Sequence, residues 1–100
     1  MARPVSKLPV VRRDLAVVID EAISAQAVLD ALAAVKPASV DRMALFDFYR
    51  GRGVEVGKKS LAILVLMQDT ARTLTDAEID ATVAVLLREI ENRFGGTLRR

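Results

Sequence analysis

The fold of this chain is decided by the stretch Leu45-Phe-Asp-Phe-Tyr-Arg-Gly51 and by two blocks that follow it, Gly57-Lys-Lys-Ser-Leu-Ala62 and Thr73-Leu-Thr-Asp-Ala-Glu78. The first block is rich in aromatic residues, which favour β-strands, and it ends at a glycine-containing turn. The second block begins a longer apolar run, which is typical of a strand that follows the turn. The third block is a capping box, because Thr75 and Glu78 have the spacing at which two residues cap each other at a helix start. This region therefore predicts strand, turn, strand and helix.

The elements on either side follow from the spacing of apolar residues. A helix is expected from its N-cap Ser24 to Lys36-Pro37, because the residue before a proline is disfavoured in the α conformation. Gly95-Gly96 provides the stop signal for the helix that starts at the capping box. Strands are expected over residues 15–19, 43–49, 59–68 and 97–99.

The predicted order β-α-β-β-α-β is that of an α+β, ferredoxin-like fold: a four-stranded antiparallel sheet with two helices on one face. Alternation along each strand then assigns side chains to the helix face or to the open face. On the second strand, we expect Phe46 and Phe48 to face the helices. Asp47 and Tyr49 are expected on the open face. On the other long strands, the expected helix-facing residues are Leu15, Val17, Ile19, Leu61, Ile63, Val65 and Met67, and the expected open-face residues are Asp14, Ala16, Val18, Ser60, Ala62, Leu64 and Leu66.

Composition limits the function classes. The 100 residues make one domain, 52% of them are hydrophobic, and no apolar run approaches the ~20 residues of a membrane span. Cysteine is absent, so disulfides and thiolate zinc sites are excluded and a cytoplasmic location is expected. Histidine is absent too, which removes the usual general base and the commonest metal ligand. We expect neither a catalytic residue nor a metal site.

The charges are unevenly distributed, although the net charge is only +2. Basic residues gather before the first strand and around the central turn, whereas acidic residues gather in the predicted helices and at strand ends. The electrostatic field of such an uneven charge distribution favours a polyanionic partner. The alternative is that lysine and arginine simply keep a small domain soluble.

The three blocks, preceded by Arg12-Arg-Asp-Leu-Ala16 and followed by Gly95-Gly-Thr-Leu-Arg99, resemble one family closely. That family is the ferredoxin-fold anticodon-binding domain at the C-terminus of the phenylalanyl-tRNA synthetase beta chain. The resemblance runs from about Ser6 to Arg100. It implies an anticodon-binding domain over residues 6–100, preceded by a leader over residues 1–5 that could in part be foreign to the natural chain.

The resemblance also implies a function in protein biosynthesis. The family's parent enzyme is an alpha2-beta2 ligase that uses ATP and magnesium to attach phenylalanine to its tRNA. This domain would engage the anticodon stem-loop of phenylalanine tRNA, while aminoacylation occurs elsewhere in the enzyme. Its implied partners are that tRNA, the rest of the beta chain and the alpha chain, with no membrane. The domain itself would hold no cofactor and catalyse nothing.

The candidate RNA site lies on the open face, since antiparallel sheets of this topology bind single-stranded RNA by stacking its bases and reading their edges. Ala16 and Ala62 would leave a shallow space beside Tyr49. Asp14, Asp47 and Ser60 would hydrogen-bond base edges there. In the family, the block that starts at Arg12 begins the first strand beside the RNA-facing surface. Phosphate contacts would come from Arg12, Arg13, Arg50, Lys58 and Lys59.

Other interpretations stay open. Tyr49 could close the edge of the core, and Asp47 could pair with a neighbouring arginine. Leu64 and Leu66 are unusual on an RNA-facing strand and favour contact with another domain of the parent enzyme. The chain could also be a regulatory or protein-interaction domain that uses its open face as an oligomer interface.

Several catalytic or ligand-binding patterns fail. Gly51 and Gly57 have the wrong spacing for a phosphate-binding loop, and they lie between strands rather than before a helix. An acylphosphatase-like enzyme would need a phosphate-binding loop after the first strand, where residues 20–23 are acidic and lack glycine. Capping and helix-dipole roles account for Asp76, Glu78 and Asp80, which could otherwise be taken for metal ligands.

Overall fold

The computed structural model describes residues 10–69 and 72–98. The predicted leader and Arg99, which was expected in the last strand, lie outside this part of the chain. The elements are β1 (Val11–Asp20), α1 (Ala25–Val35), β2 (Val40–Tyr49), β3 (Lys58–Met67), α2 (Asp76–Phe94) and β4 (Thr97–Leu98). Their order is the predicted β-α-β-β-α-β.

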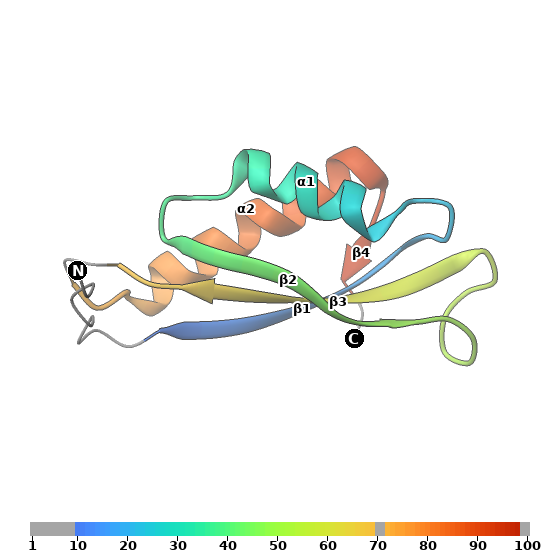
Figure 1. The fold of residues 1–100 in the computed structure, drawn as a ribbon, viewed down its shortest axis with the longest axis horizontal. Helices are drawn as coiled ribbons and strands as arrows, with labels where there is room; N and C mark the ends of the chain where they lie inside the picture. Colours follow the sequence, from blue (N-terminus) through green and yellow to red (C-terminus); the bar gives the residue numbers. More distant parts are fainter. Residues whose placement is uncertain (1–9, 70–71, 99–100) are drawn as a thin grey trace, which may run out of the picture.

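The sheet has the strand order β2-β3-β1-β4, and its paired strands are antiparallel. Both helices lie on the same side of it, so one face is covered and the other is open (Figure 1). The predicted ferredoxin-like architecture is therefore confirmed.

The core lies between the sheet and the helices. Alternate side chains of β1 and β3 are at most 3% exposed, so the alternation predicted for these strands is confirmed. Apolar side chains from both helices pack against them. The core residues contributed by the helices are Val28, Leu32, Ile79, Leu86 and Ile90.

The predicted helix caps are also confirmed. The Ser24 hydroxyl accepts a 3.1 Å hydrogen bond from the backbone N–H of Ala27. At the start of α2, the Thr75 side chain accepts from the backbone N–H of Glu78, and the Glu78 carboxylate accepts from that of Thr75. Gly95 ends α2 with φ +64°, a left-handed conformation that favours glycine.

One assignment on β2 is wrong. Phe46 was expected to face the helices, but the register slips between Leu45 and Asp47, and the Phe46 side chain is 50% exposed. A β-bulge inserts one extra residue into a strand, so the alternation restarts with the opposite phase beyond it. Phe48 does lie opposite the buried Leu61, but at the sheet edge it remains 49% exposed.

Strand bounds differ from the sequence-based ones mainly at β1 and β2. Both start earlier than expected, at Val11 and Val40, so the arginines before residue 14 are strand residues. Between β2 and β3, the chain turns through Gly51, Gly53 and Gly57, all with positive φ. The tip is tied back to the first loop, because the backbone N–H of Glu21 donates to the carbonyl oxygen of Gly57 at 2.9 Å.

No helix in the described ranges is both long and apolar enough to cross a membrane.

Candidate nucleic-acid interface

Cross-strand register arranges the open face in rows across β2, β3 and β1. Residues directly opposite on neighbouring strands point to the same face, so each row is a set of neighbouring side chains. The rows are Arg42, Leu66 and Arg12; then Ala44, Leu64 and Asp14; then Asp47, Ala62 and Ala16; and finally Tyr49, Ser60 and Val18.

A hollow of about 60 Å³ lies where the last two rows meet. It exists because two alanines stand side by side in the middle of the sheet, where larger side chains would fill the space. Its position is the one predicted from the sequence. The hollow is lined by Ala16, Ala62, Ser60, Asp47, Tyr49 and Phe48.

Polar groups at the hollow are fixed by local contacts. The Ser60 side chain is buried at 4% exposure, yet its register places it opposite Tyr49 on the open face. The Asp47 carboxylate accepts a 2.8 Å hydrogen bond from the backbone N–H of Phe48, which holds the acid beside the hollow. The hydroxyl of Tyr49 donates to the carbonyl oxygen of Arg52 at 2.6 Å, and the side chain is 38% exposed. An aromatic ring and oxygen acceptors therefore surround one shallow space.

Arg12 is engaged twice on the open face. Its Nε donates to the Asp14 carboxylate at 2.9 Å, and its guanidinium lies 5.6 Å from the centroid of the Phe46 ring. Asp14 is thereby held in an exposed ion pair, which contributes about 0–1 kcal/mol to stability. Arg13 lies opposite the buried Val65, and its guanidinium donates to the carbonyl oxygen of Arg12 at 2.9 Å. Arg13 therefore belongs to the helix side of β1 rather than to the row that carries Arg12.

The remaining predicted cations lie near the hairpin end of the sheet. Arg50 lies 5.5 Å from the Phe48 ring centroid and 3.7 Å from the Glu21 carboxylate. Lys58 is paired in register with Asp20 and continues the open-face phase of Ser60. Lys59 is paired in register with the buried Ile19, which places it on the helix side. Two of the five predicted phosphate contacts, Arg13 and Lys59, are thus separated from the hollow by the sheet.

The Glu78 carboxylate has a structural role, and this role accounts for its lowered pKa. The Arg72 guanidinium donates to its carboxylate, and together with the hydrogen bonds from Thr75 this lowers the pKa of Glu78 to about 2. The same pairing raises the pKa of Arg72. The ion pair lies at the start of α2, on the covered side of the sheet, and does not contribute to the hollow.

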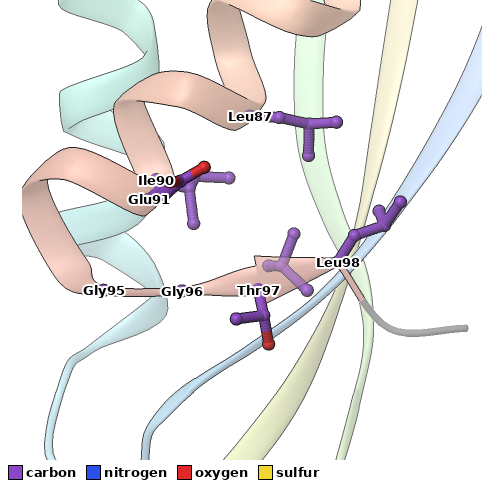
Figure 2. Close-up of a pocket in the computed structure, with 8 residues that line it drawn as sticks. Leu87, Ile90, Glu91, Gly95, Gly96, Thr97 and Leu98 are labelled. Atoms are coloured by element: carbon purple, nitrogen blue, oxygen red, sulfur yellow. The ribbon is translucent and has the colours of Figure 1, made fainter.

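A larger hollow, of about 390 Å³, lies between the end of α2 and β4. Figure 2 shows Leu87 and Ile90 of α2 on one side of it and Leu98 of β4 on the other. The titratable side chain in its lining is Glu91, whose negative charge disfavours phosphate. This hollow therefore fits RNA less well than the smaller one on the open face.

Comparison with known proteins places this chain in a family. The model of the ferredoxin-fold anticodon binding domain matches residues 6–99. The chain belongs to this family. The resemblance inferred from the sequence blocks is confirmed.

Curated relatives of this anticodon-binding domain are phenylalanine–tRNA ligase beta subunits. Those of Chromobacterium violaceum and Nitrosospira multiformis are 51% and 50% identical to the chain over 98 residues, which is 98% of this chain. That of Aromatoleum aromaticum is 47% identical over 97 residues. The chain spans about 12% of the length of each of these relatives.

Alternation alone missed two open-face residues of this domain, Phe46 and Arg42. A signal for Phe46 was present in the sequence. The apolar residues Met43 and Leu45 share one phase of the alternation, whereas Phe48 has the other, and such a change of phase within a strand is typical of a β-bulge. A second bulge, between Val40 and Arg42, gives Arg42 its place opposite Leu66.

Proposed function

We propose that this domain binds the anticodon region of phenylalanine tRNA through the open face of its sheet. The single observation that carries the proposal is the hollow beside Tyr49, in a chain that belongs to an anticodon-binding family. An unpaired base needs a flat apolar surface for its ring and polar groups for its edge. The Tyr49 ring supplies the flat surface, and Asp47 and Ser60 supply the polar groups. These three residues lie in two neighbouring rows of the sheet.

The proposed binding mode assigns each side chain a task. Tyr49 stacks on the base, because its ring is tied in place by Arg52 and pays little further ordering entropy on binding. The Asp47 carboxylate and the Ser60 hydroxyl accept hydrogen bonds from the base edge, which gives discrimination. Arg12 and Lys58 contact phosphates, which gives salt-dependent affinity. Ala16 and Ala62 leave the space that the base enters. Asp14 lies in the neighbouring row, where it holds Arg12, and Arg50 lies beside Phe48 near the hairpin end. Arg13 and Lys59 could act only on RNA that passes the sheet edge.

The proposed parent protein is the beta subunit of a cytoplasmic phenylalanine–tRNA ligase. In an alpha2-beta2 enzyme of this kind, ATP and magnesium would serve aminoacylation in another part of the assembly. This domain would contribute affinity and anticodon discrimination and would not react with substrate itself. Its affinity in isolation is expected to be modest, since the whole enzyme would hold tRNA at several sites at once.

The proposal is tested by titrating the chain into two fluorescently labelled RNA stem-loops and measuring their anisotropy at several salt concentrations. One stem-loop carries the phenylalanine anticodon, and the other carries the same loop bases in scrambled order. We expect tighter binding of the first, with an affinity that falls as salt rises. Equal binding of both stem-loops, or no binding at millimolar protein, would contradict the proposal.

A further inference from the structure

Phe46 is an aromatic side chain that the bulge of β2 turns onto the open face. It is 50% exposed, and it lies between the row of Ala44 and Leu64 and the row of the hollow. A half-exposed phenylalanine in the middle of a strand buries little area, so its contribution to the core is small. Its ring is, however, placed as a stacking surface.

The ring already has a cation over its face. The guanidinium of Arg12 lies 5.6 Å from its centroid, and the Arg12 side chain is 57% exposed. An exposed cation–π contact and an exposed ion pair are both weak, so together they hold Arg12 loosely. A base stacked on an aromatic ring contributes roughly 5- to 150-fold in affinity. A nucleobase can therefore take the place of Arg12 on the ring, or stack on the outer side of its guanidinium.

The charges around this surface favour a polyanion over a protein. The nearest row contains Asp14, which is already paired with Arg12, and the row beyond it ends in Arg42 on β2 and Arg12 on β1, with Leu66 between them. Cations at both ends of an apolar strip suit a strand whose bases are apolar on their faces and whose backbone is negative. A polypeptide partner would instead bury these arginines at a cost, unless it supplied matching carboxylates.

We propose that Phe46 and Arg12 form a second base-stacking position, which receives an unpaired base of the same single-stranded RNA that occupies the hollow. The inference rests on the proposed function and extends it to a second base. Phe46 and Tyr49 are three residues apart, or roughly 10 Å at about 3.3 Å per residue along a strand. That separation is larger than the ~3.4 Å between stacked neighbours, so the two positions hold different bases and require an unstacked RNA.

The test measures how tightly variants of the chain bind a series of anticodon stem-loops, each with one loop base removed to leave an abasic sugar. With intact RNA, Phe46→Ala is expected to weaken binding by roughly 5- to 150-fold, the loss typical of one base–aromatic stack. This loss should vanish with one abasic RNA, whose missing base marks the one that stacks on Phe46. Tyr49→Ala should give the same pattern with a different abasic RNA.

Two further variants separate stacking from other effects. Phe46→Leu keeps apolar area but removes the aromatic face, so it should weaken binding nearly as much as Phe46→Ala. Val85→Ala is the matched control, since Val85 is 39% exposed on α2, on the covered side of the sheet. It should bind RNA like the unaltered chain. Thermal unfolding of each variant checks that the fold is intact.

The outcomes distinguish the two proposals. If Tyr49→Ala weakens binding and Phe46→Ala does not, the second stacking position is refuted and the anticodon function stands. If neither variant weakens binding, both proposals fail. If Phe46→Leu binds as well as the unaltered chain while Phe46→Ala does not, the contact is apolar packing, and the surface suits a protein partner instead.

Discussion

The hydroxyl of Tyr49 donates a 2.6 Å hydrogen bond to the backbone carbonyl oxygen of Arg52. This bond joins the last residue of β2 to the glycine turn that follows it. A tyrosine at a strand end can adopt several rotamers, and the bond selects one in which the ring borders the alanine hollow. The turn thus determines the orientation of the proposed stacking surface.

Two substitutions of Tyr49 distinguish the contribution of its ring from that of its hydroxyl hydrogen bond. Tyr49→Phe removes the hydrogen bond and keeps the ring, so the variant should retain most of the RNA affinity. Its free energy of unfolding should fall by about 0.5–1 kcal/mol. Tyr49→Ala should weaken RNA binding by about 1–3 kcal/mol. Anisotropy titration and chemical denaturation measure the two quantities. Unchanged affinity in a folded Tyr49→Ala variant would remove this residue from the site.

Filling the hollow should block binding without unfolding the domain. Ala62 is half-buried on the open face, so Ala62→Leu places its extra atoms in the hollow rather than in the core. We expect RNA affinity to fall at least tenfold, which corresponds to about 1.4 kcal/mol, with a nearly unchanged unfolding midpoint. Ala84→Leu, at an exposed position of α2, is the matched control and should bind normally. Equal affinity of the two variants would show that the hollow holds no base.

Gly96 should be intolerant of a side chain for a steric reason. A Cβ at this position would lie 2.5 Å from Cγ2 of Ile90 and 2.9 Å from Cγ2 of Ile19, both of which are in the core. Gly96→Ala is therefore expected to destabilise the fold by about 1–3 kcal/mol. Denaturant unfolding measures the change, with exposed Asn92→Ala as a control expected to stay within about 0.5 kcal/mol. An unchanged midpoint for Gly96→Ala would mean that β4 packs less closely against α2 than the structure describes.

Glu78 should make the stability of the folded domain depend on pH. Its folded pKa of about 2 lies below the ordinary 4.5, so the ionised carboxylate is favoured in the native state. Its contribution is complete above about pH 4.5 and is lost as the pH falls toward 2. In Glu78→Gln, which can still accept from the Thr75 N–H, the unfolding temperature should fall less between these pH values. A parallel fall in both proteins would assign the acid sensitivity to other carboxylates.

The sequence was sufficient for those features that depend on local spacing. The capping box of Thr75 and Glu78 and the N-cap Ser24 involve residues within one turn of each other, so their partners can be inferred from the chain itself. The alternation of β1 and β3 was equally readable, because both strands are central and are buried on one face.

Alternation was insufficient on β2, which lies at the edge of the sheet. Burial constrains an edge strand only weakly, so its bulges are poorly marked, and Phe46 was assigned to the wrong face. Pairing across strands also decided which cations share a face. Arg12 and Arg13 are equivalent in the sequence, yet their partners Leu66 and Val65 place them on opposite sides of the sheet.

The sequence by itself determined the family, the order of elements and five of the six residues that line the hollow, because each depends on short motifs or on strict two-residue alternation. Only the tertiary structure decided which side chains of Leu45-Phe-Asp-Phe-Tyr-Arg-Gly51 act together. A single inserted residue shifts the register of β2 against β3, and that register is a property of the paired strands. The same shift brings Phe46 beneath Arg12 and gives the open face its second aromatic surface.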